Sequence, residues 1–184
     1  MTAPEFARPH RLDQIGAGTS DVTIEADPAE RAALAERFRL LAIETLTARY
    51  ALRRDAAGIR ATGHLSARVT QSCIVTEVPL PAKVEEDFDL RFVPEPGDGA
   101  SDEVELDEGD CDTIFYTGGA IDLGEAAAET LALALDPFPR SPGADAELRA
   151  AGVLSEDEAE VAAAEEKPAS PFAALAGLKT PKGE

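Results

Sequence analysis

The sequence has few cysteines, few basic residues in its second half and no long apolar segment. Its two cysteines, Cys73 and Cys111, lie far apart in a chain without a recognisable secretion signal. We therefore expect free thiols rather than a disulfide framework. No window approaches the roughly 18 apolar residues of a membrane-spanning helix, and the first twenty residues lack the apolar core of a signal peptide. These absences predict a cytoplasmic protein that does not act at a membrane.

The charge is distributed unevenly along the 184 residues. The formal net charge is -19, yet residues 1–82 contain ten arginines and ten acidic residues, while residues 83–184 contain seven basic and twenty-six acidic residues. The negative electrostatic field of such a protein opposes phosphate-driven binding of nucleic acid over the whole surface, and it favours basic protein partners. Charge alone identifies no particular partner.

The first half of the chain changes from a helical to a strand-like hydrophobic pattern. A helix is predicted over residues 28–40, with Asp27 as its N-cap and Pro28 at its first position. A short strand is predicted before it, around Val22 and Ile24. With 44% hydrophobic residues, the chain has enough apolar material for a core.

Three longer segments alternate between apolar and polar residues, at residues 43–53, 59–70 and 83–92. Such alternation is typical of strands with one buried and one wet face, and the turn-forming sequence DAAG separates the first two. The sequence therefore predicts an antiparallel β-meander.

A second helix is predicted from Asp122 to about Leu135. Asp122 and Glu125 are spaced like a capping box, leucine and alanine form one apolar stripe, and two prolines stop the helix. This helix is long enough to cover the apolar face of the sheet. The predicted fold class is α+β, an antiparallel β-meander covered on one face by helices, with a largely flexible acidic C-terminal tail.

The composition shifts to alanine and glutamate after Arg140. We predict a β-rich α+β domain over residues 1–140 and, over residues 141–184, an acidic linker followed by a short helical motif. Within that second part, Ser155 is predicted to cap a short acidic helix.

The last residues of the chain form a short apolar stretch flanked by proline. Ser170 can cap a helix that places Phe172 and Leu175 on one face and Lys179 near its end. A helix of about eight residues is marginal alone in water, so it needs a surface on which to dock. Phe172, Leu175 and Lys179 are therefore candidate partner-binding residues. Docking on a partner and docking back on the chain's own sheet stay equally open.

The polar face of the predicted sheet carries a row of basic residues. Neighbouring strands bring together five candidate RNA-binding residues: Arg49, Arg53, Arg60, His64 and Arg68. In the alternative, which we favour, the acids of the next strand pair with this row across the ladder, each pair contributing a few tenths of a kcal/mol to about 1 kcal/mol. Those acids are Glu85, Asp87 and Asp89.

The acid-rich run from Asp98 to Asp112 is the other candidate site. Carboxylates are preferred ligands of hard cations, but the spacing does not match a calcium-binding loop. We expect an exposed loop there, with a brief strand at Val104 to Leu106. No nucleophile or nucleotide-binding motif is recognisable, and His64 has no nearby histidine or cysteine in sequence. We therefore expect no enzyme activity, cofactor, metal or small-molecule substrate.

Four segments together resemble a known family. ARVTQSCIVTEVPLP, KVEEDFDLRFVP, IDLGEAAAETLALALDPFPR and KPASPFAALAGLK have the order and spacing of the YceD-like family, the large ribosomal RNA subunit accumulation proteins. The resemblance extends from about Ala7 to Lys179. Many members carry a Cys-x-x-Cys pair at the sheet turn. Here Cys73 matches the first position and Thr76 stands at the second, so no metal is expected and Cys73 is expected to be a small, partly buried hydrophobe.

The resemblance implies a small cytoplasmic, non-enzymatic factor required for accumulation of 23S rRNA, acting in its synthesis, processing or assembly into the large ribosomal subunit. The expected partners are large-subunit assembly intermediates, through rRNA or a basic ribosomal protein. Two alternatives from other classes stay open. One is a protein-interaction adaptor unrelated to ribosomes, and the other, a remote one, is a metal-dependent hydrolase that uses acids such as Asp102, Asp107 and Asp110.

Overall fold

The computed structural model describes residues 4–96 and 112–165, with side chains up to residue 161. The chain divides into two compact units, Met1–Ser141 and Pro142–Glu184. Each unit is described by itself below, and the division into a domain over residues 1–140 and a linker with a helical motif over residues 141–184 stays a prediction. The strand predicted at Val104 to Leu106 and the tail residues Phe172, Leu175 and Lys179 lie outside the described residues.

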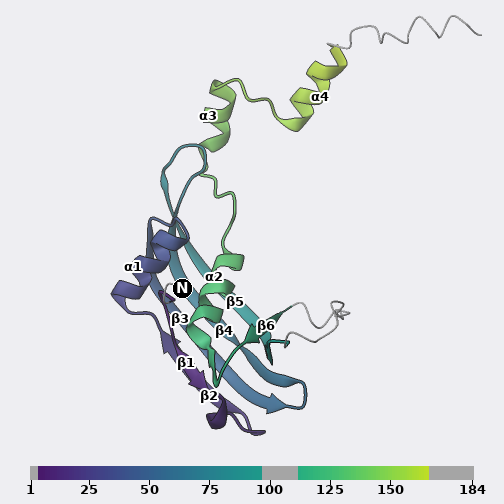
Figure 1. Cartoon of the computed structure of the whole chain (residues 1–184). Coiled ribbons are helices and arrows are strands. Elements are labelled where there is room, and N and C mark those ends of the chain that lie inside the picture. The colour runs from purple at the N-terminus through teal and green to yellow at the C-terminus, as the bar shows by residue number, and fades with distance from the viewer. Residues whose placement is uncertain (1–3, 97–111, 166–184) are drawn as a thin grey trace, which may run out of the picture. The chain divides into compact units, whose positions relative to one another are not determined.

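A five-stranded sheet forms the centre of the first unit (Figure 1). Its strand order is β2-β3-β4-β5-β6, and the first four strands pair antiparallel, so the predicted meander is confirmed. The bounds are β2 Ser20–Glu25, β3 Ala42–Asp55, β4 Gly58–Ser72, β5 Pro79–Pro94 and β6 Thr113–Tyr116. The sequence pattern did not predict β6, which pairs parallel with the end of β5.

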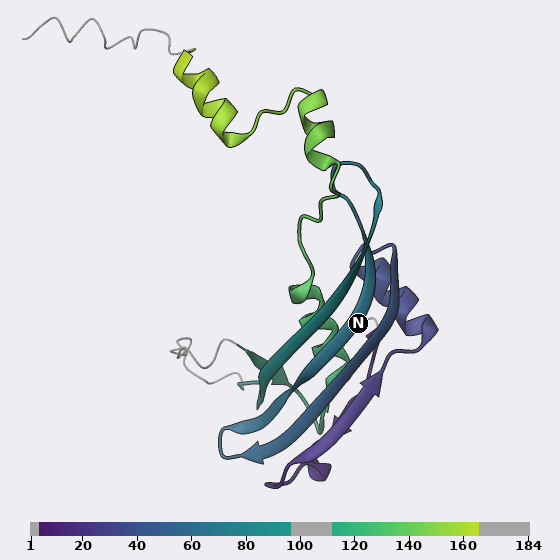
Figure 2. The ribbon, with the colours of Figure 1, turned by 180° about the vertical axis from the view of Figure 1, so that it is seen from behind.

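The alternation seen in the sequence corresponds to the two faces of this sheet. The predicted apolar residues of β3 and β4 are buried, with the exception of the half-buried Gly63, and most of those of β5 are buried as well. The buried residues of β3 and β4 on this face are Leu46, Ala48, Tyr50, Leu52, Ile59, Ala61, Leu65, Ala67 and Val69. Figure 2 shows the opposite face, over which no described helix of the first unit lies.

Helix α1, Pro28–Arg37, packs against β3 and begins as predicted. The Asp27 side chain accepts hydrogen bonds from the backbone amides of Ala29 and Glu30, and Glu30 returns one from the Asp27 amide, so a complete capping box is present. The helix ends three residues before the predicted Leu40. Arg39 adopts a left-handed conformation with φ of 55°, and the Leu40 amide donates to the Ala35 carbonyl at 2.8 Å. This Schellman-type end closes the helix without glycine.

Helix α2, Leu123–Ala134, packs on β4 and β5 on the apolar face of the sheet (Figure 1). Asp122 caps it through the amides of Gly124 and Glu125, but only half of the predicted capping box forms. The Glu125 carboxylate instead pairs with Arg37 of α1 at 2.7 Å. Asp122 also accepts from the Arg8 amide at 2.8 Å, next to a small two-stranded pairing that the sequence analysis missed. Its strands are β1, Pro9–Arg11, and β7, Ala120–Asp122.

One row across the sheet explains how the central strands and α2 are held together. Tyr50, Gly63 and Phe88 face one another on β3, β4 and β5. Because Gly63 has no side chain, the Tyr50 and Phe88 rings meet above it with centroids 4.9 Å apart. The buried Tyr50 hydroxyl donates to the Leu123 carbonyl at 2.7 Å, which fixes the start of α2 over this row.

The second unit contains two described helices, α3 Ala144–Ala150 and α4 Glu156–Glu165. The Glu158 amide donates to the Ser155 hydroxyl at 3.3 Å, and the Ser155 amide donates to the Glu158 carboxylate at 2.8 Å. The prediction that Ser155 caps an acidic helix is therefore confirmed.

Candidate nucleic-acid interface

The structure brings the five predicted basic residues onto the uncovered face of the sheet. Arg49 lies opposite His64, and Arg53 lies opposite Arg60, on β3 and β4. Arg68 lies nearer the other end of β4, opposite Thr45. The strand alternation that buries Tyr50 and Leu65 necessarily turns these five side chains to the other side.

Two of the five basic residues are neutralised by acids of β5, as the favoured alternative predicted. The Arg60 guanidinium forms a bidentate pair with the Asp89 carboxylate. The His64 ring lies between two carboxylates, with Nδ1 at 2.6 Å from Asp87 and Nε2 at 2.7 Å from Glu85. Because both ring nitrogens face acceptors, the arrangement suits the doubly protonated imidazolium.

These contacts shift the pKa values of the groups that make them. The hydrogen bond with Glu85, followed by that with Asp87, raises the pKa of His64. Lys83, then His64 and Ser66, hold the pKa of Glu85 at about 2. The hydrogen bond from Arg60 lowers the pKa of Asp89. The central part of β4 and β5 is therefore a network of acidic and basic groups that hold one another.

The side chains of the other three basic residues, Arg49, Arg53 and Arg68, make no hydrogen bond or ion pair with any other described residue. Arg49 borders a shallow hollow of about 380 Å³ whose rim includes Thr23 and Thr62. Free guanidinium groups of this kind bind phosphate well, because they offer several donors in a planar fork. These three arginines are the part of the predicted interface that is available to an anionic partner.

A sixth basic residue, Arg91, joins this face and was not singled out from the sequence. The register places Arg53, Arg60 and Arg91 in one row across β3, β4 and β5. Arg91 contacts Asp55 at 3.4 Å, a long ion pair between half-exposed groups. Its position in the alternating pattern of β5 was visible in the sequence, but its row depends on strand register, which the sequence leaves open.

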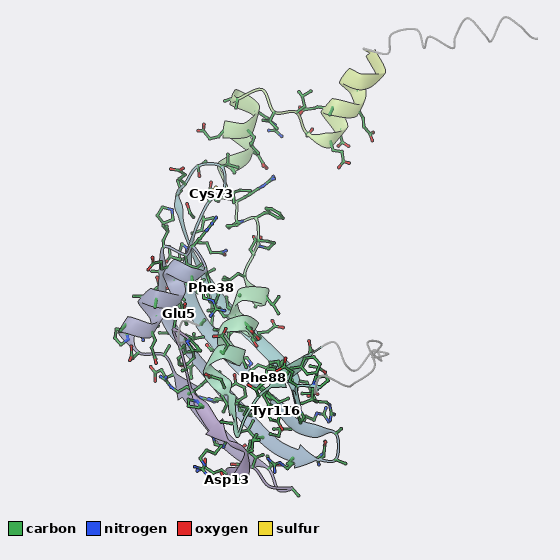
Figure 3. The ribbon with its side chains drawn as sticks, in the orientation of Figure 1. Glu5, Asp13, Phe38, Cys73, Phe88 and Tyr116 are labelled. Carbon is green, nitrogen blue, oxygen red and sulfur yellow. The ribbon has the colours of Figure 1, made fainter. Side chains whose placement is uncertain are left out.

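Cys73 lies where the β4–β5 hairpin turns (Figure 3). It is buried, and its Sγ accepts hydrogen bonds from the amides of Ser141 at 3.2 Å and Thr76 at 3.4 Å. Burial raises the pKa of the thiol, but the bonds from Ser141 and Thr76 outweigh it and the pKa falls to about 6. The expectation of a small hydrophobe is thus only half right, since the sulfur is a hydrogen-bond acceptor that ties the segment after α2 to the hairpin.

Within residues 4–96 and 112–161, no three His, Cys, Asp or Glu side chains are grouped closely enough to hold a metal ion. The acid run that the hydrolase alternative requires lies, except for Asp112, outside this part of the chain. None of the described helices has the length and apolar character needed to cross a bilayer.

Comparison with known proteins adds one finding. The family model of the large ribosomal RNA subunit accumulation protein YceD matches residues 61–179, more than half of the chain. The match includes most of β4, all of β5 and α2, and the tail residues Phe172, Leu175 and Lys179, whereas Arg49, Arg53 and Arg60 precede it. No curated protein and no solved structure matches the chain.

Proposed function

The chain belongs to the YceD family, named for large ribosomal RNA subunit accumulation, and we propose that it is a non-enzymatic, cytoplasmic factor required for accumulation of 23S rRNA. It would act in the synthesis or processing of that rRNA, or in its assembly into the large ribosomal subunit. The family match carries this proposal.

The uncovered sheet face supports direct contact with RNA through Arg49, Arg53 and Arg68. The three guanidiniums lie on adjacent strands and none of them has an acidic partner among the described residues. Arg60 and His64 are already engaged by acids and would have to exchange those partners for phosphate. The interface therefore contributes about three phosphate contacts rather than five.

The first experiment tests the function itself. Depletion of the protein should lower the ratio of 23S rRNA to small-subunit rRNA in total RNA, and the wild-type gene should restore it. An unchanged ratio after verified depletion would refute the proposed function and favour an adaptor unrelated to ribosomes.

A second experiment tests the arginines. We would replace Arg49, Arg53 and Arg68 by glutamine and measure binding to a 23S rRNA fragment as a function of salt. Three lost phosphate contacts change the slope of log K against log salt by about 2 to 3. A control with the same change in net charge replaces Arg11, Arg39 and Arg149, which lie elsewhere on exposed surfaces. If both variants bind like the wild type, the sheet face makes no contact with RNA.

The tail residues Phe172, Leu175 and Lys179 stay a proposed docking element for a ribosomal or assembly partner. Sedimentation of gentle lysates through sucrose gradients should place the wild type with large-subunit precursors. The variant Phe172→Ala/Leu175→Ala should remain at the top of the gradient. Equal sedimentation of both proteins would exclude the tail as the docking element.

A further inference from the structure

Strand β5 has an edge that the sheet leaves open. On one side β5 pairs with β4 along nearly its whole length, from Pro79 to Phe92. On the other side β6 pairs only with Arg91–Pro94. From Pro79 to Leu90 no described strand lies on that side, so this stretch is an edge strand in the described part of the chain.

The backbone groups that point to this open side can be identified from the bonds at its end. The Arg91 amide donates to the Asp112 carbonyl at 3.0 Å, on the β6 side of the strand. Since alternate residues of a strand direct their amides to the same side, the amides of Asp89, Asp87, Glu85 and Lys83 point the same way. Pro81 occupies the next position in this series and has no amide hydrogen, so the series of free donors ends there.

A groove runs along the same edge, between β5 and α2. It has a volume of about 280 Å³ and is bordered by the consecutive β5 residues 86–90, by Asp112, and by Thr130, Leu133 and Ala134 of α2. Leu133 is 88% exposed, although α2 buries its other two leucines and three of its alanines. Phe88 of β5, labelled in Figure 3, is one of the residues that line the groove. The groove therefore has four apolar residues in its lining: Phe88, Leu90, Leu133 and Ala134.

The rim of the groove is acidic. Glu86, Asp87, Asp89 and Asp112 border it, and no basic side chain is among its lining residues. Asp89 is engaged by Arg60 and Asp87 by His64, while Glu86 and Asp112 make no ion pair with a described residue. The edge thus combines free backbone donors, an exposed leucine and uncompensated negative charge.

We propose that the β5 edge from Lys83 to Leu90 and this groove bind an extended segment of another protein, rich in lysine or arginine, as an added strand. The backbone of the segment would bond the free amides of β5, an apolar side chain would lie between Leu90 and Leu133, and its basic side chains would face Glu86 and Asp112. We propose a basic protein segment because its positive charge complements the acidic residues that border the groove. Nucleic acid would meet the carboxylates as like charges, and so would the same edge of a second copy of the chain.

Acidic residues along an edge strand also have a simpler explanation, because charges are a common protection against edge-to-edge aggregation. That explanation accounts for Glu85, Asp87 and Asp89 but gives no reason for Leu133 or for an apolar groove beside the edge. The identity of the natural partner rests on the proposed function, because a basic protein of the large ribosomal subunit has the charge that this site requires. The binding test below does not depend on it.

The test uses the full-length chain and a defined probe. The probe is a synthetic twelve-residue peptide with threonine at every second position and with lysine and valine in turn at the positions between, so that lysine and valine lie on the same face of the strand. The control peptide has glutamine in place of every lysine. We expect the lysine peptide to bind, with NMR shift changes concentrated on Lys83–Leu90 and Leu133. The glutamine peptide should bind at least about tenfold more weakly, because it lacks the charges that face the rim.

Two pairs of variants separate the backbone edge from the groove. Asp87→Pro removes one outward amide, and Asp87→Ala removes the same carboxylate but keeps the amide. We expect Asp87→Pro to bind the peptide about tenfold more weakly than Asp87→Ala. Leu133→Asn should also weaken binding, whereas Leu41→Asn, at an exposed leucine away from the groove, should not. Unchanged circular dichroism would show that each variant is folded. If Asp87→Pro does not fold, the comparison of Leu133→Asn with Leu41→Asn tests the proposal by itself.

Several results would overturn the proposal. Equal binding of the lysine and glutamine peptides, equal affinity of the Leu133 and Leu41 variants, or shift changes on the arginine face would each reject this site. A concentration-dependent dimer that Asp87→Pro dissociates would show that a second copy occupies the edge. If Asp87→Pro loses the peptide but still restores 23S rRNA levels after depletion, the site exists but serves another purpose. The proposed function would then stand without it.

Discussion

Replacement of Gly63 by alanine should destabilise the protein strongly, because this position has no room for a methyl group. A Cβ placed on Gly63 would lie 2.6 and 2.8 Å from two atoms of the Phe88 ring, and closer still to the backbone carbonyl oxygen of Arg49. Ordinary van der Waals contact requires 3.4 to 4 Å. The ring can rotate away, but the carbonyl belongs to the neighbouring strand and can only move with it.

The expected loss of stability combines the clash with the Phe88 ring and the clash with the Arg49 carbonyl. Overpacking of a core by one methyl group typically costs about 1 to 3 kcal/mol, and separating β3 from β4 at this row weakens at least one ladder bond at about 1 kcal/mol. We therefore expect the free energy of unfolding to fall by about 3 kcal/mol in Gly63→Ala. For a chain of this size the midpoint of thermal unfolding should fall by about 6 to 12 °C.

Urea unfolding followed by circular dichroism measures this loss, and Gly18→Ala is the control. A Cβ on Gly18 meets nothing within 4 Å, so this variant should lie within about 0.5 kcal/mol of the wild type. Adding Phe88→Leu to Gly63→Ala should recover only part of the loss, because the Arg49 carbonyl stays in place. A loss below about 1 kcal/mol in Gly63→Ala, or full recovery in the double variant, would refute this account of the row.

Three further predictions concern single groups. Asp122→Ala should lower the free energy of unfolding, measured in urea, by about 2 kcal/mol, because it removes the α2 cap and the bond to the Arg8 amide. Asp122→Asn should keep most of the wild-type stability. The His64 imidazolium should titrate by NMR above its usual value near 6.5, and its contribution to stability, complete below that pH, should disappear as pH rises through the higher pKa. A His64 pKa at or below about 6.5 would exclude the two-carboxylate contact. In a Cys111→Ser background, thiolate absorbance of Cys73 should appear near pH 6. Appearance only above pH 8 would show that the bonds to its Sγ are absent in solution.

The sequence predicted the faces of the long strands well because alternation is a local property. The apolar residues at 46, 48, 50 and 52 must lie on one side of any strand, whatever its neighbours are. The cap of α1 was predictable for the same reason, since Asp27, Pro28 and Glu30 act within a single turn. Local patterns of this kind need no knowledge of strand order.

Features that depend on distant residues escaped the sequence analysis. Strand β6 has four residues and joins β5 in parallel, after a long connection whose length gives no register. Glu125 was expected to return a bond to the Asp122 amide, but the Arg37 guanidinium of α1, 88 residues away, binds it instead. Similarly, the composition of the Cys73 turn gave no sign that the Ser141 amide would donate to the thiol.

The open edge of β5 could not be inferred from the alternation either, and its chemistry explains why the acids of this strand have two roles. Side chains at odd positions of β5 point to the uncovered face, where Glu85, Asp87 and Asp89 neutralise His64 and Arg60. The backbone amides of those same residues point to the free edge. A basic segment in the groove would face Glu86 and Asp112 rather than these carboxylates, so it would leave their pairs with His64 and Arg60 in place. The edge and the arginine face should therefore bind their ligands independently, and binding of the lysine peptide should leave binding of RNA unchanged.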